Sequence, residues 1–138
     1  MLRTVLVAFL AVSCFGCSLA GREAPPEDAE KAGAQFFERL QGAQYEVIYN
    51  DASDILQKEK ARVSVVEDLK KVTALGRIHE YRRRGANFSK EGDKSFAVVN
   101  YNVTFEQTRG EAILQFIDVG GEWKLSGYSF GTRGSSVQ

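Results

Sequence analysis

An alternation of apolar and polar residues runs through the second half of the sequence, and it is the feature that most constrains the fold. From Phe96 to Phe105 the odd-numbered positions after Phe96 are apolar, and a period of two returns from Ala112 to Phe116. Such alternation is typical of strands with one buried face. Gly120-Gly121 then interrupts the pattern, as a two-residue hairpin turn would. The sequence therefore predicts antiparallel strands joined by short turns.

Two predicted turns set the register of these strands. A turn at Thr108-Arg109 pairs Phe105 with Ala112, and the turn at Gly120-Gly121 pairs Phe116 with Leu125. Both turns place the same set of side chains on one face, whereas a slip of one residue would scatter them. That face carries Val103, Phe105, Leu114, Phe116, Trp123 and Leu125.

The residues before this region show the period of a helix instead. Three helices are expected, over 27–42, 45–52 and 65–75. Ser64 and Glu67 have the spacing of a capping box, and Gly76 would end the third helix. The apolar stripes consist of Ala29, Ala32, Phe36, Phe37, Leu40 and Ala43, then Tyr45, Ile48, Tyr49 and Ala52, then Val66, Leu69 and Val72.

The segment Arg77–Phe88 shows neither period. Charged residues occupy both of its alternate sets, as expected of a strand at the edge of a sheet, and residues 89–93 are expected to form a loop. Three helices followed by four meandering antiparallel strands predict one α+β domain over 27–132, with the helices covering one face of a curved sheet. Residues 133–138 are expected to form a disordered tail.

The first 26 residues are expected to lie outside this domain. Arg3 is followed by an uncharged stretch from Thr4 to Gly21, with its apolar centre at 5–12. A basic start and a short apolar run are typical of a secretory signal peptide. A transmembrane helix would need a longer apolar core, because serine and glycine residues dilute the second half of this stretch.

Both cysteines of the chain lie in this stretch. Gly16-Cys17-Ser18 resembles a bacterial lipoprotein signal, in which 1–16 would be removed and Cys17 lipidated; Cys14 is the alternative. An ordinary cleaved signal peptide without lipid is a further interpretation. Residues 17–26 would then be the lipidated N-terminus and a flexible tether, which spans at most roughly 30 Å. The absence of Asp after Cys17 resembles sorting to the outer membrane, with the domain facing the periplasm.

The order of elements resembles the nuclear transport factor two–like superfamily, also called the cystatin-like or cone-shaped α+β fold. The resemblance is carried by Phe36-Phe37 and Leu40, by Tyr45–Tyr49, and by Gly120–Tyr128, which reads Gly-Gly-Glu-Trp-Lys-Leu-Ser-Gly-Tyr. Within the superfamily the chain looks most like small bacterial lipoproteins. Members often pair through the sheet, so the resemblance implies a homodimer as one expected partner.

The same superfamily includes ketosteroid isomerase, which needs a carboxylate base inside an apolar cavity. Asp118, opposite Trp123, is the carboxylate expected near the inner face, and Tyr45, Tyr49 and Tyr101 would supply hydroxyls. These five residues form the candidate ligand pocket. The simpler interpretation places Asp118 in water beside the hairpin turn.

Composition narrows the function further. The chain has 18 basic and 18 acidic residues, whereas nucleic-acid binders usually carry a basic excess, so no nucleic acid is expected. The single histidine, His79, has no expected partner for a metal site, and no cofactor is expected. Arg82 and Arg84 share a strand face and form a candidate anion contact; a solvated edge strand is the simpler interpretation.

A candidate interface lies on the sheet face turned away from the helices, where Ile113, Ile117, Tyr128 and Phe130 are expected. The sequence therefore favours a membrane-anchored envelope lipoprotein without catalytic activity, which binds a protein partner or a small ligand. The alternative is a small enzyme of the isomerase or dehydratase type that uses Asp118 and a tyrosine.

Overall fold

The computed structural model describes residues 27–132 and 135–137, with four helices followed by an antiparallel sheet. The helices are α1 (Glu27–Gln41), α2 (Tyr45–Asn50), α3 (Asp54–Glu59) and α4 (Arg62–Thr73). The strands are β1 (Ile78–Glu91), β2 (Lys94–Phe105), β3 (Arg109–Val119), β4 (Glu122–Thr132) and β5 (Ser135–Val137), paired in that order. This arrangement confirms the α+β class and the meander. The predicted signal peptide and tether, with Cys14 and Cys17, lie outside the described residues.

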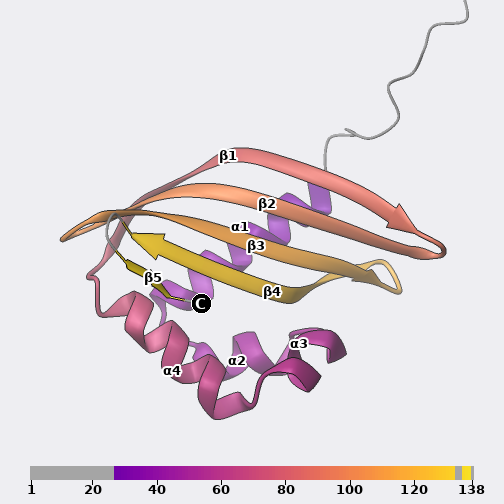
Figure 1. The fold of residues 1–138 in the computed structure, drawn as a ribbon, viewed down its shortest axis with the longest axis horizontal. Coiled ribbons are helices and arrows are strands. Elements are labelled where there is room, and N and C mark those ends of the chain that lie inside the picture. The colour runs from indigo at the N-terminus through magenta and orange to yellow at the C-terminus, as the bar shows by residue number, and fades with distance from the viewer. Residues whose placement is uncertain (1–26, 133–134, 138) are drawn as a thin grey trace, which may run out of the picture.

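The helices lie on one side of the sheet. Figure 1 shows α1 passing behind it and α2, α3 and α4 beneath it. Helix α1 follows its predicted stripe, since Ala29, Phe36, Phe37 and Leu40 are buried. Ala43 is the exception: it is exposed and has a φ of 55°, because the chain has already left the helix and turns toward α2.

The structure contains α3, which the sequence did not predict. This helix has six residues, and Leu56 is its buried apolar residue, which is too little to show a helical period. Helix α4 begins earlier than predicted, with Ala61 at its N-cap. The predicted capping box formed by Ser64 and Glu67 is therefore wrong. Both residues lie inside the helix. After α4, Gly76 has a φ of 102°, as expected of a glycine that follows a helix.

Strand β1 lies at the edge of the sheet, as predicted, but it is longer than expected. It continues to Glu91, which pairs with Lys94 across a turn where Gly92 has a φ of 64°. The predicted loop at 89–93 is therefore mostly strand, because Gly92 permits a two-residue turn. The pairing with β2 shifts between Ile78 and Glu80 and again between Arg83 and Gly85. These bulges interrupt the period of two, which explains why the sequence pattern of this strand was unreadable.

The register between β2 and β3 differs from the prediction by four residues. Ala112 pairs with Tyr101 rather than with Phe105, because the turn lies two residues earlier than predicted, at Glu106-Gln107. It closes on a hydrogen bond from the Phe105 amide to the Thr108 carbonyl, 2.8 Å. Arg109 is consequently the first residue of β3 and not part of the turn. Four is an even number, so the predicted faces survive the shift: Val103, Phe105, Leu114 and Phe116 are all buried.

The hairpin at Gly120-Gly121 confirms the predicted pairs of Phe116 with Leu125 and Asp118 with Trp123. Beyond Leu125, however, the register shifts, so that Gln115 pairs with Gly127 and Ser126 has no partner across the ladder. This bulge reverses the faces of the rest of β4. Tyr128 and Phe130 therefore pack toward the helices, and their predicted place on the outer face is wrong.

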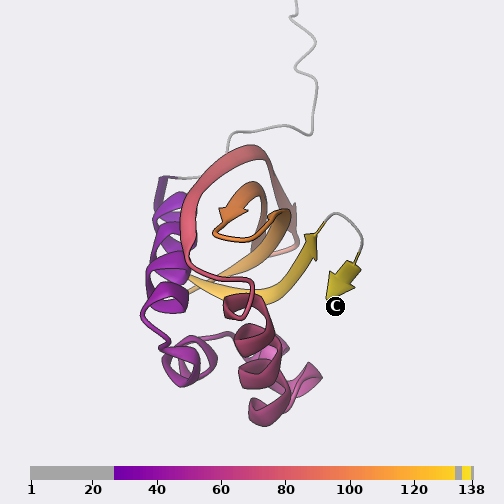
Figure 2. The same ribbon diagram turned by 90° about the vertical axis from the view of Figure 1, so that its left-hand side faces the viewer.

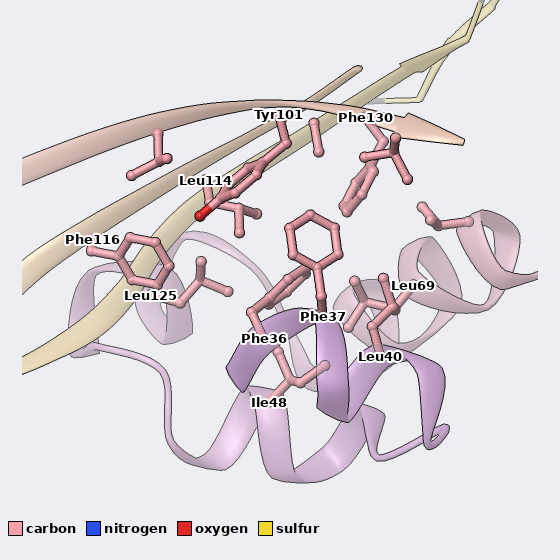
Figure 3. Close-up of a cluster of buried hydrophobic side chains, with 14 of the residues drawn as sticks. Phe36, Phe37, Leu40, Ile48, Leu69, Tyr101, Leu114, Phe116, Leu125 and Phe130 are labelled. Atoms are coloured by element: carbon pink, nitrogen blue, oxygen red, sulfur yellow. The ribbon is translucent and has the colours of Figure 1, made fainter. Parts of the chain in front are cut away.

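The core fills the space between the sheet and the helices. Figure 3 shows Phe36 and Phe37 of α1 pointing toward side chains that descend from the sheet, among them Leu114, Phe116 and Phe130. The sheet is curved, as Figure 2 shows. Its curvature brings Phe88 of β1 to Trp123 of β4, with ring centroids 6.0 Å apart, although two strands separate them in the sheet.

Part of the predicted disordered tail is a strand instead. Ser135–Val137 forms β5 and pairs with Phe130–Thr132, because the edge of β4 offers unpaired backbone groups to the returning chain. Residues 133, 134 and 138 lie outside the described residues. Within the part of the chain that the structure describes, no helix is long and apolar enough to cross a membrane.

Gly33 is a close contact between α1 and the sheet. A Cβ atom at this position would lie 2.0 Å from the hydroxyl oxygen of Tyr101. Alanine ordinarily stabilises a helix relative to glycine by roughly 1 kcal/mol. We expect Gly33→Ala to destabilise the domain by about 1–3 kcal/mol instead, because the Tyr101 ring that carries this hydroxyl is buried and packs against Phe37 and Tyr81. Urea denaturation measures the difference.

The double variant Gly33→Ala/Tyr101→Phe provides the control, because it removes the atom that clashes. We expect it to recover most of the loss caused by Gly33→Ala. A Gly33→Ala protein as stable as the parent would show that α1 does not approach β2 this closely.

Candidate functional site

The residues of the predicted Asp–Tyr pocket do not come together. Asp118 lies in β3 six residues beyond Ala112, the register partner of Tyr101, which is roughly 20 Å along a strand. The Asp118 carboxylate accepts a hydrogen bond from the Gly121 amide at 2.9 Å and so stabilises the hairpin turn. Trp123, its pair across the hairpin, packs edge-on against Phe88. This geometry agrees with the simpler interpretation, in which Asp118 is a turn residue.

The predicted tyrosines serve separate contacts. The Tyr45 hydroxyl lies 2.8 Å from the Thr73 Oγ1 and joins α2 to α4. The Tyr49 hydroxyl donates to the carbonyls of Gln57 and Lys60, 3.4 and 3.3 Å away. Tyr101 is buried beneath α1, and this burial raises the pKa of its phenol to about 12. At neutral pH the Tyr101 phenol is therefore a protonated group and not a base.

A polar cluster under the sheet joins α4 to β4. Tyr128 donates a hydrogen bond to Asp68 Oδ2 at 2.8 Å, and Lys60 Nζ lies 3.1 Å from the same oxygen. Burial and the neighbouring carboxylate both raise the pKa of Tyr128 above its ordinary value. The Lys60 ammonium also lies 4.9 Å from the centre of the Tyr128 ring. These contacts hold the end of α3, helix α4 and strand β4 together.

A first groove lies between α1 and the β3–β4 hairpin, with a volume of about 600 Å³. Apolar side chains that belong to the core line it, including Phe36, Phe116 and Leu125, and Trp123 lies beside them. Its charged residues include Arg39 and Asp51, which pair with each other at 2.8 Å. Of the predicted pocket residues, Trp123 lines this groove, whereas Asp118 does not.

A second groove, the outer-face groove, lies on the side of the sheet away from the helices and has a volume of about 840 Å³. Three neighbouring strands each contribute two polar residues to it: Glu80 and Arg82 from β1, Asn102 and Thr104 from β2, and Arg109 and Glu111 from β3. The ladder sets them in two rows, since Arg82, Asn102 and Glu111 are register partners, as are Glu80, Thr104 and Arg109.

The predicted anion contact belongs to this groove. Arg82 lines it, and Arg84 reaches its residue Glu111, so both arginines lie on the outer face. Arg83 points the other way and pairs with Glu30 of α1. Sequence reasoning missed Arg109, because the predicted turn at Thr108-Arg109 removed that residue from the strand. The sequence signal for it was its position two residues before Glu111, in the same alternate set of β3.

The predicted interface loses half of its members. Ile113 and Ile117 lie on the outer face, but Tyr128 and Phe130 pack against the core because of the bulge at Ser126. Ile117 is 5 % exposed and is flanked in the ladder by Phe96 and Lys124. Ile113 is 38 % exposed and remains accessible. The described outer face therefore carries less apolar surface than the sequence predicted.

Within residues 27–132 and 135–137, no cluster of histidine, cysteine, aspartate or glutamate side chains has the geometry to hold a metal ion. His79 is exposed near the start of β1. Compared with models of protein families and with curated proteins, the chain matches none.

Proposed function

We propose that this protein is exported and anchored to a bacterial membrane by lipid on Cys17, and that its α+β domain is a binding module in the envelope. The single observation that carries the proposal is Gly16-Cys17-Ser18 at the end of an apolar run that begins just after Arg3. Helix α1 begins at Glu27, so residues 18–26 separate the anchor from the domain. The serine after Cys17 favours the outer membrane, with the domain in the periplasm.

The proposal of binding rather than catalysis is supported by the contacts of the candidate residues. Asp118 accepts a hydrogen bond from a turn amide, and Tyr49 donates to backbone carbonyls. General acid–base catalysis instead needs a carboxylate and a donor that converge on one substrate position. The ligand or protein partner would contact the domain at one of the two grooves.

We also propose that the domain has the cone-shaped fold of the nuclear transport factor two–like superfamily. Two observations support this. The residues Trp123, Lys124, Gly127 and Tyr128 of the family-like ending all lie in β4. The curvature of the sheet brings Phe88 of β1 into contact with Trp123 of β4.

Metabolic labelling with a fatty-acid analogue tests the anchor. We expect the parent protein to carry the label and Cys17→Ser to lose it completely, because thioether attachment requires the thiol of that residue. Cys14→Ser is the matched control and should keep the label. Loss of label in Cys14→Ser alone would move the anchor to Cys14, and an unlabelled parent protein would overturn lipid anchoring.

A further inference from the structure

We propose that the outer-face groove binds a small soluble anion that carries carboxylate or phosphate groups. This inference names a ligand class for the binding role proposed above and rests on that role. The arginines in and beside the groove come from two strands, and the register of the sheet brings them to one face.

The charge balance of the groove favours an anion. Arg82 Nε donates to Glu80 Oε1 at 2.7 Å, and Arg84 Nη1 donates to Glu111 Oε1 at 2.5 Å. Within each pair the carboxylate neutralises the charge of the guanidinium. The third guanidinium, that of Arg109, makes no ion pair with a residue in the described part of the chain, so one positive charge of the cluster is uncompensated.

The donors needed to hold an anion are present around Arg109. Guanidinium groups match carboxylate and phosphate oxygens because their N–H donors are planar and bind in pairs. Arg82 bonds Glu80 through its Nε, and among the described residues its Nη groups have no hydrogen-bond acceptor. Between Arg82 and Arg109 lie Asn102 and Thr104, whose amide and hydroxyl add neutral donors. The volume of about 840 Å³ accommodates an organic anion.

The position of the groove favours a soluble ligand over a lipid headgroup. It lies beside the β2–β3 turn, since Thr108 and Arg109 line it. Figure 1 shows this turn at one end of the sheet and the first residues of α1 toward the other. The groove and the first residues of α1, which follow the proposed tether, therefore lie toward opposite ends of the sheet.

Isothermal titration calorimetry tests the proposal on the full protein, purified from the membrane in detergent at low ionic strength. Citrate and inorganic phosphate serve as probes, and sodium chloride at matched ionic strength corrects for screening. We expect Arg109→Gln to weaken binding of the better probe about tenfold or more, since it removes a charge-assisted contact. Glu80→Gln should tighten binding severalfold, because it frees Arg82 for the anion.

Lys90→Gln is the matched control, because it removes the same charge from an exposed position at the far end of β1. Its affinity should stay within about twofold of the parent. Equal effects of Lys90→Gln and Arg109→Gln would overturn the site, as would the absence of binding by either probe at millimolar concentration. Binding of a short-chain phosphatidylglycerol in place of both probes would overturn the soluble ligand. Fatty-acid labelling of Cys17 is independent of all these results, so either proposal, the lipid anchor or the anion site, can be refuted without the other.

Discussion

Phe130→Asp is expected to abolish folding of the domain at room temperature. Phe130 is 4 % exposed, and its ring centroid lies 6.1 Å from that of Phe36 in α1. Truncating a buried phenylalanine typically costs about 3–5 kcal/mol, and a buried unpaired carboxylate adds several kcal/mol more. A domain of this size is typically stable by about 5–15 kcal/mol in total. Circular dichroism should therefore show loss of the native spectrum, or a midpoint of urea denaturation near zero.

Ile113→Asp is the matched control for this prediction. Ile113 precedes Leu114 in β3 and lies on the opposite, outer face, where it is partly exposed. We expect a change below about 1 kcal/mol, as is usual for surface substitutions. Without the bulge at Ser126, Phe130 would lie on the same outer face as Ile113. If Phe130→Asp and Ile113→Asp lowered the free energy of unfolding by equally small amounts, the reversed faces at the end of β4 would be contradicted.

Phe37→Ala is expected to destabilise the domain by about 3–5 kcal/mol. The Phe37 side chain is fully buried at the centre of the helix–sheet contact. Its ring stacks on Tyr81 of β1 with centroids 4.3 Å apart and meets Tyr101 of β2 edge-on at 4.9 Å. An alanine would leave a cavity between α1 and two strands and remove both aromatic contacts. Urea denaturation measures the loss as a lower midpoint with an unchanged slope.

Glu38→Ala provides a comparison at the next position of α1, which is exposed. We expect it to change the free energy of unfolding by less than about 0.5 kcal/mol. The loss of stability caused by Phe37→Leu should lie between those of Glu38→Ala and Phe37→Ala, because leucine keeps part of the buried volume. A loss below about 1 kcal/mol for Phe37→Ala would show that α1 does not pack on β1 and β2 as described.

The core was largely predictable because its signal is periodic. The spacing of Phe36, Phe37 and Leu40 marks the buried stripe of α1, and the alternation from Ala97 to Phe105 marks the inner face of β2. Helix α3 was not predictable, because one buried leucine in six residues carries no period. The β2–β3 register was wrong by four residues, yet the inner face was right, since side chains repeat every second residue.

The outer-face groove was only partly predictable. The sequence singled out Arg82 and Arg84, because adjacent arginines on a charged edge are conspicuous. It could not bring them to Arg109 and Glu111, because that proximity depends on two strand registers and on a bulge in β1. The paired glutamates are equally non-local: Arg84 and Glu111 are 27 positions apart in the chain.

The sequence by itself determined the α+β class, the order of the strands and the inner face of the sheet as far as Leu125, because these follow from local periods and from a glycine turn. It also carries the whole argument for the proposed anchor, which rests on residues 3–18. Only the tertiary structure decided the faces of Tyr128 and Phe130, the separation of Asp118 from Tyr101 and the gathering of charges around Arg109. The physical reason is that a bulge inserts a single residue without a pattern of its own, yet reverses the side chains that follow it in the strand. A shift of register by an even number of residues likewise leaves the alternation unchanged, while it changes which residues lie opposite one another.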